Sequence, residues 1–258
     1  MSSILSEIKN SIAFITLNRP EKFNSFNREM ALSLQERLKE ADSNKEIRCV
    51  YITGAGKAFC AGQDLAEVVD PYGPGMDKIL VEHFNPIITR IRNLSKPVVA
   101  AVNGVAAGAG ANIALCCDVV VAAESASFIQ AFSKIGLIPD SSGTFFLPRL
   151  IGFQKASALM MLGDKVNATD AEKAGMVYKV FNNDVFKEES IKLATTLAGM
   201  PTKALGFIKQ ALNKSLNQNL EQQLKTEDEF QQASAATNDF KEGVQAFLEK
   251  RSPIFNGE

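Results

Sequence analysis

The chain of 258 residues contains a single histidine, His83, and no tryptophan. Zinc sites built on two or three histidines are therefore excluded, and a Ser-His-Asp triad could use only His83. The four cysteines form no Cys-x-x-Cys pair, so the sequence indicates neither a metal site nor a disulfide framework. Any proton transfer is expected to use a carboxylate or an ordered water, because the usual acid–base side chain is nearly absent.

Charge imbalance and long apolar runs are also missing. The 28 basic and 29 acidic residues give a formal net charge of −1, and they form no block of one sign. This composition gives no support for binding nucleic acid or a membrane surface. No run of 18 apolar residues occurs, and the first ten residues lack the apolar core of a signal peptide. We expect a cytoplasmic protein whose cysteines are small buried side chains in a reducing compartment.

Strand and helix patterns alternate over the first 200 residues, which is typical of an α/β fold with right-handed crossovers. The strands are expected at residues 4–9, 12–17, 49–53, 98–102 and 118–123, with a hairpin turn at Asn10 and Ser11.

Helix signals follow these strands. Asn27 is expected to cap a helix with one apolar stripe, and Pro86 is expected to kink a helix over residues 79–91. Residues 66–75 contain two prolines and two glycines, so a mobile loop is expected there. His83, next to this segment, is expected on a helix surface.

After Pro201 the pattern is entirely helical, and we place a boundary there, with a core of residues 1–200 and a helical region of residues 201–258. Thr169 and Glu172 are expected to form a capping box at the start of a short helix that ends at Gly175, and Asp239 with Glu242 is expected to open a last helix. The C-terminal helices keep a narrow apolar stripe, which fits either a subunit contact or packing on their own body.

Two glycine-rich turns, residues 56–65 and 104–110, each follow a strand and precede a helix. Such turns leave backbone N–H groups unpaired, and these groups can bind a phosphate or a developing oxyanion. The alternative is that the glycines only allow close packing of helix and strand.

Asp140 lies among apolar residues in the segment 132–146. Desolvation there should raise its pKa toward values useful for proton transfer. A plainer interpretation is that Asp140 caps a helix that starts near Ser141, and both can hold at once.

Several motifs together resemble those of the crotonase (enoyl-CoA hydratase/isomerase) superfamily. They are ITLNRP at 15–20, AFCAGQDL at 58–65, VNGVAAG at 102–108, GD at 163–164, AEKAGM at 171–176 and EGVQAFLEKR at 242–251. The resemblance covers essentially the whole chain. It implies an α/β spiral of β-β-α units, a C-terminal helical trimerisation region and a CoA thioester substrate. It also implies that the thioester oxygen is held by the backbone N–H groups of Gln63 and Ala109.

The sequence departs from the hydratases of this superfamily at two positions. Their two glutamates correspond to Asn112 and Phe132, neither of which can exchange a proton, so simple hydration is disfavoured. Asp140 falls where several isomerases carry their acid–base carboxylate. The segments 106–111 and 131–149 resemble the isomerases that convert the ring epoxide of phenylacetyl-CoA to oxepin-CoA. We therefore expect an isomerase of CoA thioesters; the alternatives are a Δ3,Δ2-enoyl-CoA isomerase (or a hydratase-like enzyme) of fatty acid oxidation and a non-catalytic acyl-CoA-binding protein.

The resemblance also implies the remaining site residues. Asp140, Gln63 and Ala109 are the expected catalytic residues. The expected substrate-binding residues are Lys22, Ala61, Asp64, Leu65, Gly108, Gly110, Asn112, Phe132, Pro139 and Lys250. Asn112 could instead orient a turn, and Lys250 could be a solvated helix end rather than a contact to a CoA phosphate. No metal and no cofactor beyond the CoA of the substrate is expected, and the partner is a further copy of the chain, in a homotrimer or a dimer of trimers.

Overall fold

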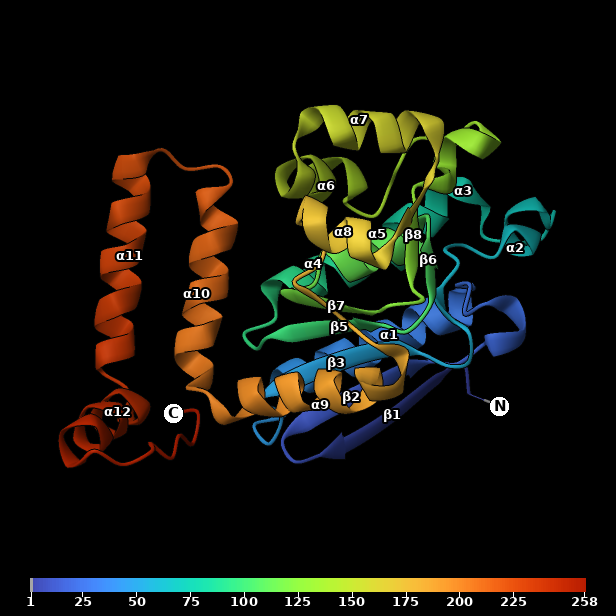
Figure 1. The fold of residues 1–258 in the computed structure, drawn as a ribbon. Coiled ribbons are helices and arrows are strands. Elements are labelled where there is room, and N and C mark those ends of the chain that lie inside the picture. The colour runs from blue at the N-terminus through green and yellow to red at the C-terminus, as the bar shows by residue number, and fades with distance from the viewer. Residues whose placement is uncertain (1) are drawn as a thin grey trace.

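A computed structural model describes residues 2–258. Its strands form two sheets (Figure 1). The main sheet has the order β1 (Ile4–Lys9), β2 (Ile12–Leu17), β3 (Cys49–Gly54), β5 (Val98–Val102), β7 (Val119–Ala123) and β10 (Lys179–Phe181). The second sheet has the order β4 (Ala58–Cys60), β6 (Val105–Ala107), β8 (Ser127–Ile129) and β9 (Lys165–Asn167).

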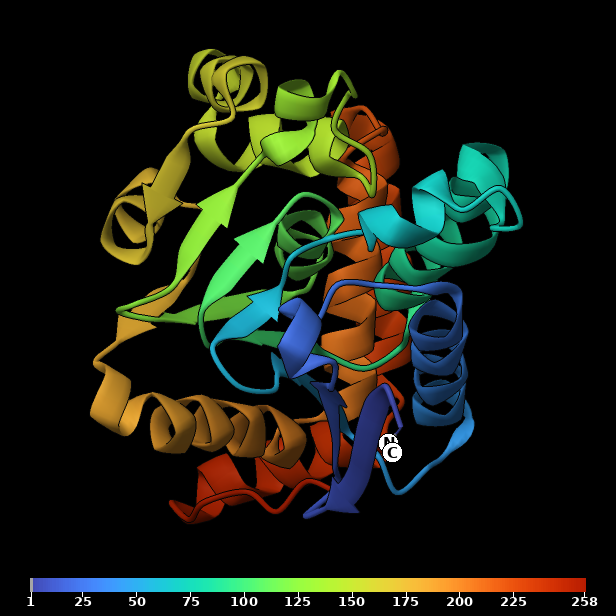
Figure 2. The ribbon, with the colours of Figure 1, turned by 90° about the vertical axis from the view of Figure 1, so that its right-hand side faces the viewer.

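The chain crosses repeatedly from the main sheet to the second sheet. It runs from β3 into β4, from β5 into β6 and from β7 into β8, and helices follow each pair (Figure 2). Strands β2, β3, β5, β7 and β10 are parallel, as are β4, β6 and β8. This repeated β-β-α path confirms the predicted α/β spiral, with each turn of the spiral stacked on the one before.

The strand sequences explain this arrangement. All five residues of β5 are buried, as expected for a central parallel strand that is covered on both faces. Strands β1 and β2 pair antiparallel, with Ile4 opposite Leu17. Asn10 and Ser11 join them with φ values of 50° and 60°, the left-handed pair that a two-residue hairpin needs. The hairpin prediction is therefore confirmed.

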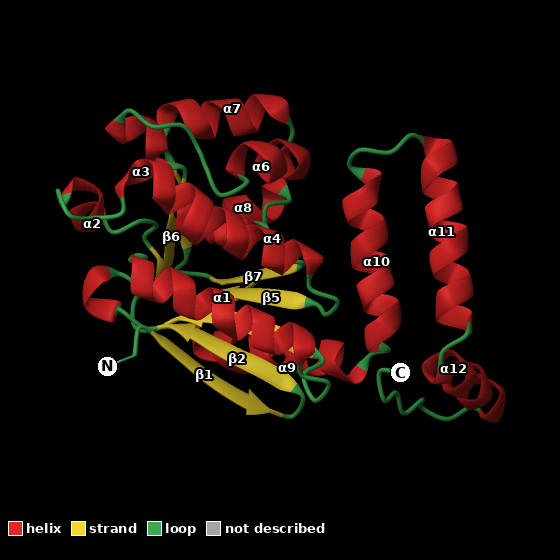
Figure 3. Ribbon diagram, turned by 180° about the vertical axis from the view of Figure 1, so that it is seen from behind, coloured by secondary structure: helices red, strands yellow, loops and turns green. Residues whose placement is uncertain are grey.

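Helices cover both sides of the main sheet (Figures 2 and 3). Helix α1 (Arg28–Ser43) begins as predicted at Asn27, whose side chain accepts the Met30 N–H at 3.0 Å. It buries an apolar stripe that includes Leu34 and Leu38. On the other side, α9 (Asn183–Gly199) packs against β2, β3 and β7.

The segment after β4 differs from the prediction of a loop. Residues 65–78 contain two short helices, α2 (Leu65–Val69) and α3 (Gly75–Lys78). A π-helix, η2 (Ile79–Phe84), then leads into α4 (Asn85–Asn93). Pro86 lies in the first turn of α4, where its missing N–H costs little, so the predicted kink takes the form of a π-to-α junction.

Both predicted helices exist, but the predicted capping box at Thr169 is wrong and the last helix starts slightly before Asp239. Helix α8 (Ala168–Ala174) begins at Asn167, whose side chain accepts the Asp170 N–H at 2.8 Å, and it ends at Gly175 as predicted. Thr237, not Asp239, caps α12 (Asn238–Glu249). Asp239 instead accepts the backbone N–H groups of Asn256 and Gly257 and fixes the C-terminal tail.

Most of the remaining helices follow the strands of the second sheet or form the C-terminal region. Helix α5 (Ala109–Leu115) follows β6, the helices η3 (Ala131–Ile135), α6 (Gly143–Ile151) and α7 (Phe153–Leu162) follow β8, and η1 (Pro20–Lys22) follows β2. Helices α10 (Thr202–Ser215) and α11 (Leu220–Ala235) form, with α12, an arm that extends from the body (Figure 1). None of the helices in residues 2–258 is long and apolar enough to cross a membrane.

A buried ionic cluster ties this arm to the body. The Lys209 ammonium of α10 lies 2.7 Å from the carboxylate of Asp118, just before β7, and its side chain is only 4% exposed. Arg92 of α4 donates to the same carboxylate at 3.1 Å. Burial lowers the pKa of Lys209, and the adjacent Asp118 carboxylate opposes that shift. The ammonium therefore depends on Asp118 to remain charged in the interior.

Replacing Asp118→Ala should lower the free energy of unfolding by about 3–5 kcal/mol, because a buried ammonium loses its partner. Urea denaturation followed by circular dichroism measures this loss. As a control, Glu40→Ala breaks the exposed pair with Arg37 and should cost below about 1 kcal/mol. Equal losses in the two variants would contradict the role given to the buried cluster.

Candidate active site

Two glycine turns meet at the top of the second sheet. Gly62 follows β4 with φ +92°, and Gly108 precedes α5 with φ +53°, conformations that favour glycine. The turns are close enough that a Cβ on Gly62 would lie 3.3 Å from the backbone nitrogen of Ala109. The residues that follow the two glycines therefore lie next to each other.

The predicted oxyanion donors, the amides of Gln63 and Ala109, are free at this spot. Neither donates a hydrogen bond to another group within residues 2–258. The neighbouring Gly62 N–H is occupied, since it donates to the Cys60 sulfur at 3.3 Å. Two unpaired N–H groups side by side can hold the oxygen of a thioester and stabilise an enolate that forms there.

A mostly apolar cavity of about 210 Å³ opens at these two amides. Gln63, Ala109 and Asp140 all line it, and so do the predicted residues Ala61, Leu65, Gly108 and Phe132. Its other walls come from α2, α3, η2, η3 and the residues just after η3, and they include the apolar Val68, Met76, Ile79, Phe84, Ile135 and Leu137 and the basic Lys134. The structure thus brings the predicted catalytic residues together in one apolar space.

Asp140 enters the cavity from a strained turn. Ser141 and Ser142 both have left-handed backbones, with φ of 48° and 65°. The Asp140 carboxylate accepts one hydrogen bond, from the Ser141 hydroxyl at 2.8 Å. Burial raises the pKa of Asp140, and the Ser141 hydrogen bond only partly offsets this.

Helix α6 contradicts the predicted role of Asp140 as a side-chain cap. Its N-cap is Ser142, with no side-chain cap, and the Asp140 backbone oxygen accepts the Gly143 N–H at 2.8 Å. The carboxylate is therefore not used for capping and remains available in the cavity.

The two hydratase positions have different roles here. Phe132 is 6% exposed, and its ring lies 3.8 Å from where a Cβ on Gly108 would stand, so it forms a wall beside the oxyanion donors. Asn112 does not line the cavity. Its side chain donates to the Asp140 backbone oxygen and accepts from the Gln130 amide, each at 2.8 Å.

The other predicted binding residues lie outside the cavity of this chain. Asp64 pairs with Arg19 at 2.9 Å and caps α2, and Gly110 lets α5 pack against Cys60. Pro139 precedes Asp140 without lining the cavity. Lys22 ends η1, and Lys250 ends α12, in the arm. Contacts of these residues with substrate remain a prediction.

His83 is buried, which corrects its expected place on a helix surface. Its Nε2 lies 3.3 Å from the Arg28 guanidinium, and burial lowers its pKa. It does not line the cavity. The spacing of Ile79, His83, Ile87 and Ile91 at four-residue intervals places His83 on the buried face, and this periodicity was the available signal.

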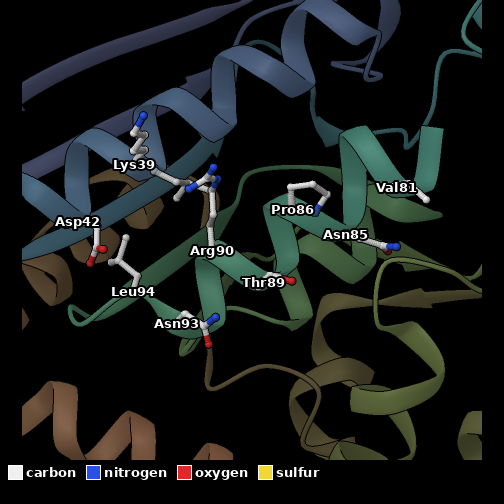
Figure 4. A pocket seen from close by; sticks show the side chains of 10 residues that line it. Lys39, Asp42, Val81, Asn85, Pro86, Thr89, Arg90, Asn93 and Leu94 are labelled. Carbon is white, nitrogen blue, oxygen red and sulfur yellow. The ribbon is translucent and has the colours of Figure 1, made fainter. Parts of the chain in front are cut away.

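A larger hollow of about 540 Å³ lies between α1 and the segment of η2 and α4 (Figure 4). Its walls include Lys39, Asp42 and Arg90. None of the predicted site residues lines it. The smaller cavity is therefore the candidate active site, because it alone of these two combines free amides with a buried carboxylate.

The chain belongs to the enoyl-CoA hydratase/isomerase family, whose sequence model matches residues 7–258. It is 48% identical to the 1,2-epoxyphenylacetyl-CoA isomerase of Escherichia coli K12, and the match covers 100% of both chains. It is 36% identical to the trans-2-decenoyl-[acyl-carrier-protein] isomerase of Streptococcus mutans, over 99% of this chain and 98% of that one. The crystal structure of an enoyl-CoA hydratase from Polaromonas sp. JS666 superposes with a TM-score of 0.89 at 34% identity, covering 98% of this chain and 99% of the other.

Replacing Asp140→Asn should raise the melting temperature near neutral pH. A carboxyl whose pKa is raised in the folded state costs stability at every pH above its unfolded pKa of about 3.9, and that cost vanishes below it. The gain should therefore shrink as the pH is lowered toward about 4.

Thermal denaturation of both proteins across this pH range measures the effect. The matched control is Glu36→Gln, which neutralises an exposed carboxylate of α1 and should leave the melting temperature nearly unchanged. A gain from Asp140→Asn that did not depend on pH would argue against a desolvated carboxylate.

Proposed function

We propose that this protein is an isomerase of CoA thioesters that converts the ring 1,2-epoxide of phenylacetyl-CoA to oxepin-CoA. The observation that carries the proposal is the single cavity shared by the Asp140 carboxylate and the free amides of Gln63 and Ala109. The likeness to the E. coli 1,2-epoxyphenylacetyl-CoA isomerase along the whole chain supports the choice of substrate.

The two amides and the carboxylate divide the chemistry between them. The thioester oxygen accepts the N–H groups of Gln63 and Ala109, which stabilise the negative charge that develops when a proton leaves the adjacent carbon. Each such donor contributes about 10²–10³ in rate in a comparable oxyanion hole. Asp140 carries the proton, and burial, which raises its pKa, makes its carboxylate a stronger base than an exposed one.

With a 3-enoyl-CoA, Asp140 takes a proton from C2 and returns it to C4. The C2–H bond breaks and its electrons form the C2–C3 double bond, while the C3–C4 double bond opens and receives the proton. No atom and no electron is gained or lost overall, so the balance requires no redox cofactor. With the ring epoxide, the same amides hold the thioester, and the apolar walls formed by Phe84, Phe132 and Leu137 suit the ring.

Two rival functions are less well supported by the cavity. A hydratase needs two carboxylates to hold and activate water, and Asp140 is the only acidic residue among the described residues that line the cavity. A non-catalytic acyl-CoA-binding protein has no use for a carboxylate that is costly to bury beside the acyl group. A Δ3,Δ2-enoyl-CoA isomerase uses the same groups and is the second candidate.

Replacing Asp140→Asn should lower kcat for cis-3-hexenoyl-CoA by about 10²–10⁴-fold, because the proton carrier is lost. The affinity for saturated hexanoyl-CoA should change little, since both amides remain. Absorbance of the conjugated product measures turnover, and calorimetry measures binding.

The choice of substrate is tested by generating the ring epoxide in situ and analysing the product by mass spectrometry and absorbance. Faster conversion of the epoxide than of cis-3-hexenoyl-CoA supports the first candidate, and the reverse order supports the second. Full turnover of both substrates by the Asp140→Asn variant would sink the acid–base role.

The arm formed by α10, α11 and α12 supports a homotrimer or a dimer of trimers. It carries large apolar side chains that are mostly exposed in a single chain, such as Leu212 at 61%, Phe247 at 82% and Leu248 at 71%. Exposed apolar surface of this kind is typical of a protein contact.

The unpaired thiols of the four cysteines support a cytoplasmic location, where reducing conditions preserve them.

Sedimentation at micromolar concentration should give a mass of three or six times the 28.0 kDa chain. Burial of the apolar arm residues provides the driving force. A stable monomer under these conditions would contradict this assembly.

A further inference from the structure

Asn112 links three segments around the candidate active site. Its side-chain amide nitrogen donates to the Asp140 backbone oxygen at 2.8 Å, and its oxygen accepts the Gln130 side-chain N–H at 2.8 Å. Both amide side chains are buried, with Asn112 1% and Gln130 3% exposed. Loss of either contact would leave a buried polar atom of Asn112 without a partner, which holds the Asn112 side chain in this geometry.

The segment that Asn112 holds is strained. Ser141 and Ser142 follow Asp140 with two successive left-handed backbones, which cost free energy in residues with a side chain, so contacts around the turn help to stabilise it. The Asp140 backbone oxygen accepts the hydrogen bonds of both Asn112 and the Gly143 N–H. Gly143 packs directly on Asn112, since a Cβ there would lie 2.3 Å from the Asn112 amide nitrogen.

Asn112 also belongs to the helix that carries an oxyanion donor. Helix α5 begins at Ala109, so Asn112 lies one turn further along the same rigid element. A hydrogen bond from Asn112 to Asp140 therefore connects the strained turn that bears the carboxylate to the helix that bears the Ala109 amide.

We propose that Asn112 is a positioning residue, which fixes the Asp140 carboxylate relative to the two oxyanion amides through its hydrogen bond to the Asp140 backbone. This inference rests on the proposed isomerase function. Asn112 touches neither the cavity nor the acyl group and acts through Asp140. Without its hydrogen bond, the left-handed turn relaxes and the carboxylate moves away from C2.

The main test is Asn112→Leu, which keeps the approximate size of the side chain and removes both hydrogen bonds. We expect kcat for cis-3-hexenoyl-CoA to fall by about 10- to 100-fold, because displacement of a catalytic group by about 1 Å has this effect. The dissociation constant for hexanoyl-CoA should change by less than about threefold, because the amides of Gln63 and Ala109 are untouched.

Two further variants separate positioning from folding. Gln130→Met removes only the support behind Asn112 and should lower kcat in the same direction by a smaller factor, which keeps the test open if Asn112→Leu does not fold. Tyr51→Phe is the matched control, because it removes a different buried hydrogen bond, at 2.8 Å to Ser190, between β3 and α9. It should lower stability and leave kcat unchanged.

A crystal structure of Asn112→Leu decides the matter independently of turnover. The inference predicts a displaced turn at residues 140–142 beside an unmoved Gly62–Gln63 turn, and an unmoved Asp140 would overturn it. An inactive Asp140→Asn variant together with a fully active Asn112→Leu variant would overturn the positioning role alone. Turnover that survives Asp140→Asn would instead overturn the proposed function.

Discussion

The close approach of two glycine turns is the constraint on which the rest of the site depends. Gly62 and Gly108 leave the second sheet with left-handed backbones and release the Gln63 and Ala109 amides toward one point. Two donors fixed in place need no reorganisation as charge develops on an oxygen, which is why backbone groups serve this purpose well. The spiral topology supplies the framework, because β4 and β6 are parallel neighbours whose ends meet at the same edge.

Asp140 shows how the fold accepts a local cost at a functional position. Its carboxylate has one hydrogen-bond donor and lies in mostly apolar surroundings, so burial raises its pKa. The two residues after it are held in conformations that serines rarely adopt. Natural proteins keep such unfavourable features mainly where function requires them, and relieving them tends to stabilise the fold while activity is lost.

Much of this architecture follows from the sequence because the signals are local and periodic. The hairpin at Asn10 and Ser11 and the cap at Asn27 depend on a few adjacent residues, and the structure confirms both. The wrong caps arise because several residues near a helix start have side chains that can cap it, and the local pattern does not choose between them. Thr237 caps α12, whereas the Asp239 carboxylate binds the backbone of the C-terminal tail. This is a contact between distant segments that no local pattern reveals.

The sequence predicted the residues of the candidate site that line the cavity, but not the residues that hold them in position. Resemblance pointed to Gln63, Ala109 and Asp140, and all three line one cavity. Asn112, by contrast, was expected to bind substrate, whereas its side chain faces Gln130 and the Asp140 backbone. Asn112 is thus linked to the segment that carries Asp140 without lining the cavity. The amide is the chemical requirement for this contact, since a neutral amide can donate a hydrogen bond to the Asp140 carbonyl and an ionised glutamate cannot.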